Sequence, residues 1–427
     1  MKIVFIDETN FTQEINTLRS TSEEKFFHVE KNVSEIIYNI QKSGDEALKH
    51  YTLKYDHADI ADFKVSDEEI NYAMQNVDSS FIDILNKAIY NIKEFHGLQF
   101  PKNLQLYRDG LELRQIYTPI ERVGIYIPGG NTVYPSTVLM NTIPAKIAGV
   151  DNICIATPPD SNRQINNKII ASAQLCGVDT IYKMGGAQAI AAFAYGTQSI
   201  KKVYKITGPG NVYVTEAKKQ VYGQVDIDML AGPSEILIIA DKDSNPKYIA
   251  ADLLSQAEHD EQALCILIST SFELAQQVIH EIDWQLNDSI NALRAKKALE
   301  NNGLIYLVSD LNVAFDLSNE IAPEHLEILL PTPEKHIDKI NNAGSVFLGE
   351  YSPEPVGDYY VGVNHTIPTS GKAKFSSPLS TMDFMKHSNI IHYNKEKFFK
   401  DRNTIETFAY MEDFTYHANA ISIRTKN

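Results

Sequence analysis

The chain has 427 residues, which is too long for one simple hydrophobic core, so we expect two or more domains. Its residues are 43% hydrophobic and 22% charged, the composition of an ordinary globular protein. A formal net charge of −16 argues against a broad binding surface for nucleic acid or for an anionic membrane, although it leaves room for a local pocket that binds an anionic cofactor.

The sequence begins with a short apolar run that acidic residues interrupt before a signal-peptide core can form. No later apolar run approaches the roughly eighteen residues that span a membrane. Cys154, Cys176 and Cys265 form no CxxC pair and lie in apolar stretches, which is typical of buried free thiols in a reducing compartment. We therefore expect a cytoplasmic protein with no membrane partner.

The first quarter of the chain is helical in pattern after a short lead. Residues 1–23 are rich in Thr and Ser and carry too little apolar material for a core, so we expect an N-terminal extension that packs on another part of the chain. From residue 24 to residue 96, apolar residues recur at helical spacing, and Ser66 with Glu69 forms a capping-box signature.

From Arg122 onward, short β-rich runs alternate with helical runs, which indicates parallel α/β sheets. Two such units follow one another, separated by the turn at residues 228–234. The expected strands of the first are 123–127, 153–156, 180–183 and 203–206, and those of the second are 236–240, 264–268, 304–308 and 345–348. Two sheets imply a cleft between them, and open α/β sheets bind ligands at the carboxyl ends of their strands.

The last part of the chain departs from this alternation. Residues 351–380 are rich in Pro, Gly, Ser and Thr but keep several aromatic residues, which favours a long ordered loop of the kind that is usually functional. From about residue 379 we expect helical segments, followed by a β-like end at residues 420–423.

Gln256 and His259 stand three residues apart at the end of the helix-like run 248–254, so they share one helix face. An amide oxygen and an imidazole nitrogen at this spacing suit Zn(II) or a neighbouring divalent ion. A surface Gln beside a His that caps a helix would give the same pattern, so both interpretations stand on this motif alone.

Four other stretches contain residues capable of chemistry. The turn Gly208-Pro209-Gly210-Asn211 could hold a phosphate at a helix start, but the GxGxxG fingerprint is absent and a plain tight turn fits equally well. The adjacent Glu324 and His325 could divide acid and base work, or could simply begin an element. The remaining candidates, each of which has a solvent-exposed alternative, are Asp358 with His365 in the long loop and Glu412 with His417 near the end.

Taken together, these stretches resemble the histidinol dehydrogenase family over nearly the whole chain, from about residue 24 to His417. The resemblance rests on these segments in order: 122–130 with Tyr134-Pro135-Ser136-Thr137, Gly185-Gly186-Ala187-Gln188, Gly208-Pro209-Gly210-Asn211, Ala231-Gly232-Pro233-Ser234-Glu235, the run 251–260 from Ala251 to Asp260, Pro323-Glu324-His325-Leu326-Glu327, and Asn364-His365-Thr366-Ile367-Pro368-Thr369.

The resemblance implies oxidation of L-histidinol to L-histidine through L-histidinal, the last two steps of histidine biosynthesis. It also implies two NAD+ per reaction, one zinc ion per subunit and a homodimer with shared active sites. By position, the implied zinc ligands are Gln256, His259, Asp358 and His417, and the implied catalytic pair is Glu324 and His325. The substrate contacts would be Ser234, His365 and Glu412 together with His325 and the zinc ligands, and the NAD contacts Tyr126, Gln188 and Asn211. Glu412 and His417 would come from the partner subunit.

The predicted fold is therefore α/β, with two doubly wound, incomplete Rossmann-like sheet domains and small terminal extension domains. We expect an N-terminal extension over 1–23, a metal and catalytic domain over 24–125 plus 236–378, an NAD-binding domain over 126–235, and a C-terminal tail over 379–427 that reaches the partner's site. The closest alternative function is a sister zinc and NAD dehydrogenase acting on another small alcohol. A zinc hydrolase and a non-catalytic homologue are more distant alternatives.

Overall fold

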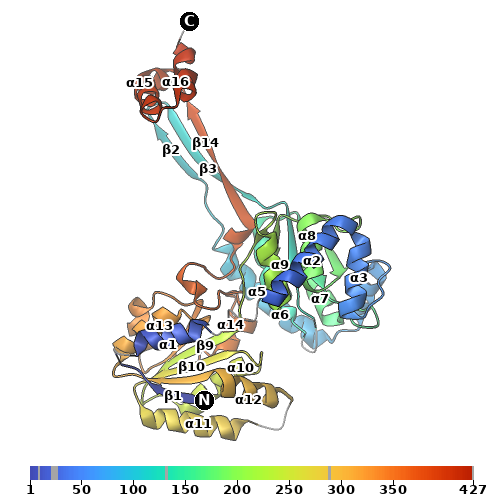
Figure 1. The fold of residues 1–427 in the computed structure, drawn as a ribbon, viewed down its shortest axis with the longest axis vertical. Coiled ribbons are helices and arrows are strands. Elements are labelled where there is room, and N and C mark those ends of the chain that lie inside the picture. Colours follow the sequence, from blue (N-terminus) through green and yellow to red (C-terminus); the bar gives the residue numbers. More distant parts are fainter. Residues whose placement is uncertain (8–9, 21–26, 130–132, 287–289, 426–427) are drawn as a thin grey trace.

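The computed structural model describes residues 1–427 except 8–9, 21–26, 130–132, 287–289 and 426–427. The chain forms two parallel sheets flanked by helices, and a narrow antiparallel arm that projects from them and carries the C-terminal helices at its tip (Figure 1). The predicted α/β class with two sheet units is confirmed.

The first sheet has five parallel strands in the order β6-β5-β4-β7-β8. Its strands are β4 (Arg122–Tyr126), β5 (Asn152–Thr157), β6 (Thr180–Lys183), β7 (Lys205–Thr207) and β8 (Asp226–Ile227). The connecting helices are α6 (Pro135–Ala148), α7 (Asn167–Cys176), α8 (Gly186–Tyr195) and α9 (Val212–Val221). The central strands β4 and β5 are apolar and buried on both faces, as a parallel sheet between two helix layers requires.

The N-terminal helices pack on this five-stranded sheet. They are α2 (Phe27–Ser43), α3 (Asp45–Asp56), α4 (Asp67–Gln75) and α5 (Ser79–Gly97). Helix α2 contacts α8 and α9, α4 contacts α7, and α5 contacts α6. The predicted capping box of α4 is present, with Ser66 and Glu69 bonded reciprocally. The assignment of residues 24–125 to the metal domain was wrong, because the apolar face of α2 is buried in the same core as Phe193 of α8.

The second sheet has six parallel strands in the order β1-β11-β10-β9-β12-β13. The strands are β1 (Lys2–Phe5), β9 (Glu235–Ala240), β10 (Leu264–Ser269), β11 (Gly303–Leu307), β12 (His325–Leu329) and β13 (Ser345–Leu348). The helices of this domain are α1 (Phe11–Ser20), α10 (Pro246–Ala257), α11 (Phe272–Gln285), α12 (Ile290–Asn302), α13 (Leu311–Ile321) and α14 (Glu354–Tyr359). Three short 3-10 turns follow β12 at Pro333–Lys339, Lys372–Lys374 and Thr381–Phe384.

The first residues of the chain are a structural part of the six-stranded sheet rather than a separate extension. Strand β1 pairs in parallel with β11 from Lys2 to Phe5, and Ile6 is buried in the core beneath the sheet. The expected extension over 1–23 is thus corrected for its described residues. Its apolar material is too small for a core of its own, but it is enough to cover the edge of an existing one.

The two sheets share one topology. Leaving β1 aside, the strands of each sheet run third, second, first, fourth, fifth in chain order. In such a sheet the connections that follow the first and the fourth strand run to opposite sides of the sheet. These two neighbouring strands are β4 and β7 in one sheet and β9 and β12 in the other.

The arm consists of β2 (Leu104–Arg108), β3 (Leu111–Pro119) and β14 (Met385–Tyr393), followed by α15 (Lys395–Met411), α16 (Thr415–Ser422) and a 3-10 turn at Ile423–Thr425 (Figure 1). Strand β14, which falls where helix was expected, pairs with β3 along all nine of its residues. The expected β-like end at 420–423 was also wrong. Its alternating isoleucines favour a strand, but that segment continues α16, which packs against α15.

The three cysteines are buried and free, as predicted. Among the described residues, no helix combines the length and the apolar composition needed to cross a membrane.

Candidate active site

Three glycine loops lie at the carboxyl ends of strands in the five-stranded sheet, after β4, β6 and β7. Gly208 has a φ of +111°, and a Cβ there would overlap the carbonyl oxygen of Tyr126, so the turn requires glycine. A buried ion pair between Lys218 and Asp228 braces this loop. The backbone N–H of Gly208 donates to Asp228 at 2.7 Å, and Lys218 Nζ donates to the carbonyl of Gly208 at 3.0 Å.

The three residues implied as NAD contacts lie around these loops. The Tyr126 hydroxyl accepts a hydrogen bond from the backbone N–H of Gly186 at 3.0 Å, which ties the end of β4 to the start of α8. Gln188 is buried in the first turn of α8. Asn211 caps α9 and is exposed, with its side chain accepting from the N–H groups of Tyr213 and Val214.

Asp56 lies against the glycine loop that follows β6, and its carboxyl group leads to a prediction about the pH dependence of stability. The backbone N–H of Gly185 and the side chain of Gln188 donate to its carboxylate, but burial has the larger effect and raises the pKa of Asp56 to about 6. An acid whose pKa is higher in the folded protein than in the unfolded chain stabilises the fold below its unfolded pKa. That stabilisation is lost as the pH rises through the folded pKa.

We therefore expect the free energy of unfolding of Asp56→Asn to exceed that of the wild type by ~1–2 kcal/mol at pH 8, an effect that partial exposure of the carboxylate to solvent keeps small. This advantage should disappear near pH 4. Urea unfolding followed by circular dichroism at both pH values measures the difference. Asp59→Asn, at an exposed carboxylate nearby, is the matched control. An advantage of the same size at both pH values would contradict the prediction.

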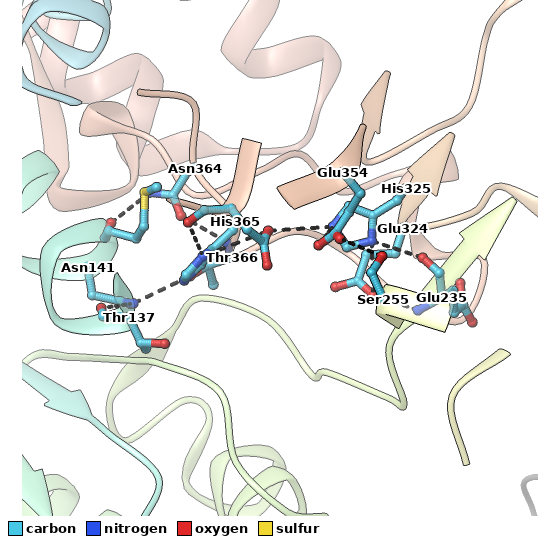
Figure 2. Close-up of polar contacts among 12 residues, drawn as sticks. Thr137, Asn141, Glu235, Ser255, Glu324, His325, Glu354, Asn364, His365 and Thr366 are labelled. Atoms are coloured by element: carbon cyan, nitrogen blue, oxygen red, sulfur yellow. Dashed lines mark hydrogen bonds and ion pairs between the residues drawn. The ribbon is translucent and has the colours of Figure 1, made fainter. Parts of the chain in front are cut away.

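The candidate catalytic pair lies at the amino edge of the six-stranded sheet. His325 is the first residue of β12 and Glu324 directly precedes it, beside Glu235 at the start of the neighbouring strand β9. The backbone of Glu235 contacts both: its N–H donates to Glu324 Oε2 at 2.8 Å, and its carbonyl oxygen lies 2.9 Å from Nδ1 of His325 (Figure 2). The general expectation of a site at the carboxyl ends of the strands therefore fails for this sheet.

The hydrogen bond from Nδ1 fixes the tautomer of His325. A carbonyl oxygen can only accept, so the proton is on Nδ1 and Nε2 carries the free lone pair. Nε2 is buried and has no hydrogen-bond partner among the described residues. Burial lowers the pKa of His325 and raises the pKa of Glu324 well above its usual value. The imidazole is therefore held neutral with its basic nitrogen free.

A cluster of metal-ligand character faces His325. The ligand atoms of His259, Glu354 and Asp358 all lie within 4.8 Å of one another. Carboxylate oxygens of Glu354 and Asp358 are each 3.9 Å from Nε2 of His325. Gln256, at the end of α10, is buried, and its Oε1 lacks a hydrogen-bond partner within the described ranges. A buried amide oxygen without a donor is what a cation would satisfy.

Glu354 was not predicted from the sequence. It starts α14 inside the segment that was expected to be a long loop, and it stands four residues before Asp358, so both carboxylates project from one face of the helix. That acidic pair at i and i+4 was the available signal. It was obscured by the prolines and glycine of the segment, since they favour a loop over a helix.

His365 and its neighbours connect this cluster to the other sheet (Figure 2). Nδ1 of His365 donates to the backbone carbonyl of Asp358 at 3.1 Å. The flanking residues bond to α6 of the five-stranded sheet: Asn364 donates to the carbonyl of Met140 at 2.7 Å, and Thr366 accepts from Asn141 at 3.4 Å. The amino edge of one sheet thus meets the helix that follows β4 at the carboxyl edge of the other.

The structure brings together five of the predicted catalytic, metal and substrate residues: His259, Glu324, His325, Asp358 and His365. Two more lie on neighbouring segments, since Gln256 is three residues before His259 and Ser234 directly precedes Glu235. The structure does not bring Glu412 and His417 to them. Both side chains are exposed near the tip of the arm, at the end of α15 and in α16 (Figure 1). Within a single chain these two residues are therefore separate from the cluster.

A surface hollow of about 510 Å³ lies elsewhere, against Arg122, Gly196, Lys201 and Lys202. Because Arg122 opens β4, this hollow is at the end of the five-stranded sheet opposite the glycine loops. It is not part of the candidate active site.

Comparison with known proteins gives a consistent result. The family model described as histidinol dehydrogenase matches residues 19–425. The chain is 49% identical to a histidinol dehydrogenase of Bacillus cereus over 425 residues, which covers 99% of each chain. It is 48% identical to one of Clostridium acetobutylicum over 397 residues, covering 93% of this chain and 92% of the other. A crystal structure of histidinol dehydrogenase from Elizabethkingia anophelis superposes with a TM-score of 0.94 at 38% identity, covering 100% of this chain and 98% of that one.

Proposed function

Because the chain belongs to the histidinol dehydrogenase family, whose members are NAD-dependent oxidoreductases of histidine biosynthesis, we propose that it oxidises L-histidinol to L-histidine through L-histidinal, using two NAD+ and one zinc ion per subunit. The observation that carries this proposal is the neutral His325, whose free Nε2 faces the cluster of His259, Glu354 and Asp358.

The donor atoms suit zinc. One imidazole nitrogen, an amide oxygen and carboxylate oxygens form a mixed nitrogen and oxygen set, and Oε1 of Gln256 has no other partner among the described residues. We assign the site to Gln256, His259 and Asp358, with His417 of a second chain as the fourth ligand. Glu354 is a further carboxylate within reach. When bound, zinc supplies a positive centre that holds the imidazole and amino nitrogens of the substrate.

In the first oxidation, Nε2 of His325 takes the proton of the substrate hydroxyl while a hydride leaves the same carbon for NAD+. The hydrogen bond from Nδ1 to the carbonyl of Glu235 keeps the ring oriented and disperses the positive charge that this proton brings. Positioning of the ring by a backbone carbonyl removes the entropic cost of aligning a mobile base.

In the second oxidation, the aldehyde must first be hydrated. Glu324 takes a proton from a water molecule while the oxygen of that water bonds to the carbonyl carbon. Glu324 can do so because burial makes this carboxylate a stronger base than an exposed one. The proton that His325 holds from the first oxidation passes to the former carbonyl oxygen, which completes the hydrate and frees Nε2 again. His325 then takes a hydroxyl proton of the hydrate, and a second hydride leaves for NAD+. The products are the carboxylic acid and a second NADH.

The nucleotide is proposed to bind at the glycine loops of the five-stranded sheet, near Tyr126, Gln188 and Asn211. Support comes from their location at the carboxyl ends of β4, β6 and β7, around the point where the connections change direction. The bonds from Asn364 and Thr366 to α6 join this edge to the catalytic cluster. A nicotinamide above this edge would therefore be directed toward His325.

We propose a homodimer in which the arm of one chain completes the site of the other. All five residues of β2 are exposed, and the arm carries large apolar side chains in the open, among them Ile391, Met411 and Tyr416, the last 88% exposed. An apolar surface of this kind is typical of an interface. A second copy of the chain fits it, because Glu412 and His417, which the family resemblance assigns to the partner's active site, lie on the same arm. The cytoplasmic location stays a prediction.

The direct test is the amount of NADH formed per L-histidinol consumed by zinc-loaded protein, followed at 340 nm. We expect two NADH, and rejection of simple aliphatic alcohols by roughly 10⁴-fold, because a site that pairs with imidazole nitrogen leaves polar groups unpaired without it. One NADH, or equal rates on both alcohols, would favour a sister dehydrogenase of the family, and no NADH would favour a zinc hydrolase.

A further inference from the structure

Two buried carboxyl groups lie behind the ligand cluster and have no role in the chemistry described above. Asp252 on α10 is 9% exposed and Glu327 on β12 is fully buried. The two carboxyl groups face each other closely enough for a side-chain hydrogen bond. Ionised carboxylates only accept hydrogen bonds, so this bond forms when one of the two groups is protonated. Burial raises the pKa of both groups, that of Asp252 to about 6, which is consistent with protonation of one of them.

The pair lies where three parts of the site meet. Asp252 is one helical turn before Gln256, on the same face of α10. Glu327 is two residues after His325 and therefore on the same face of β12. Oε1 of Glu327 also accepts a hydrogen bond of 2.7 Å from the backbone N–H of Glu354, the first residue of α14. One pair of side chains thus contacts the two helices that carry the metal-ligand candidates and the strand that carries the base.

This arrangement leads to a proposal that rests on the zinc site proposed above. We propose that the hydrogen-bonded pair Asp252 and Glu327 acts as a brace that sets the distance between the ligands on α10 and those on α14. Both are positioning residues, since they act through the ligands without contacting metal or substrate. Partners of this kind are typically responsible for a 10- to 100-fold share of metal affinity.

The first test compares two substitutions at Asp252. Asp252→Ala removes the bond to β12 while keeping a good helix former in α10. Asp252→Asn keeps the bond, because its amide can donate to an ionised Glu327. We expect zinc affinity, measured by competition with a chromogenic chelator, to fall about 10- to 100-fold in Asp252→Ala and to stay near the wild-type value in Asp252→Asn. The visible spectrum of the Co(II)-loaded protein should change only in the Ala variant.

The second test applies the same logic to Glu327. The amide of Glu327→Gln can accept from the N–H of Glu354 and donate to Asp252, whereas Glu327→Leu does neither. The double variant Asp252→Ala/Glu327→Leu should bind zinc no more weakly than Glu327→Leu alone, because the single substitution already removes the contact between the two side chains. Glu216→Leu, at a buried glutamate of the other domain, controls for general destabilisation and should leave zinc affinity unchanged.

Wild-type zinc affinity in Asp252→Ala, or an equal loss in the Ala and Asn variants, would overturn the brace. So would a zinc affinity that Glu216→Leu lowers as far as Glu327→Leu does. If Asp252→Ala and Glu327→Leu both fail to fold, the pair maintains the fold rather than the site, and the proposal is also wrong. Failure of the zinc site itself is distinguishable, because the wild type would then bind no zinc or His259→Ala would not weaken its binding.

Discussion

Replacement of His325 by Asn is expected to lower kcat for L-histidinol oxidation by roughly 10²- to 10⁴-fold, the contribution of a well-placed general base. Asparagine is the informative substitution because its amide nitrogen occupies nearly the position of Nδ1 and can still donate to the carbonyl of Glu235. It has no counterpart of Nε2. The variant therefore keeps the local hydrogen bond and loses only the basic nitrogen.

Steady-state NADH formation measures the effect, and zinc content and the melting temperature should remain close to those of the wild type. His336→Asn is the matched control, since His336 belongs to the same domain and stacks on Phe315 away from the cluster. A kcat that changes only a few-fold in His325→Asn would show that another group takes the hydroxyl proton.

The second large effect concerns the arm. His417→Ala and His325→Asn should each be nearly inactive alone, but a mixture of the two, dissociated and reassembled, should recover activity. In a mixed dimer, the body with an intact His325 receives the arm with an intact His417, and the other site lacks both. Random reassembly then gives roughly a quarter of the wild-type activity, since about half of the dimers are mixed and each has one working site.

The control mixes His325→Asn with Glu324→Gln. Both changes lie in the body of the chain, so every site in every dimer keeps one defect and no recovery is expected. If the first mixture stays inactive although size-exclusion and tagged pull-down show mixed dimers, the arm does not supply the partner's site. A fully active His417→Ala variant would lead to the same conclusion.

The part of the site that could be predicted from the sequence is the part that short segments define. Gln256 and His259 are three residues apart, and Glu324 and His325 are adjacent, so local spacing and the family resemblance were enough to group them. Glu354 needed the knowledge that its segment forms a helix. Glu235 acts through its backbone, and a backbone contact leaves no mark on residue type.

The fold was predictable where hydrophobic periodicity is strong, as in the strands around Ile155 and Ile238. The domain to which a helix belongs was harder to predict. The sequence of an amphipathic helix such as α2 indicates that it has an apolar face, but it does not indicate which sheet that face covers. Strand β14 was missed for a related reason. Its exposure is high along its length, so it lacks the alternation of a half-buried strand, and its pairing with β3 joins residues far apart in sequence.

The pairing of β1 with β11 also bears on the order in which the protein can fold during synthesis. The five-stranded-sheet domain is nearly continuous in sequence, from α2 to β8, and can form as soon as it leaves the ribosome. Strand β1 is made first, but it must wait for about 300 further residues, a delay on the order of tens of seconds at usual rates of translation. The arm is completed later still, when β14 reaches β3. We therefore expect the surface that we propose to join two chains to appear last, after both sheets have formed, which would reduce the opportunity for association between unfinished chains.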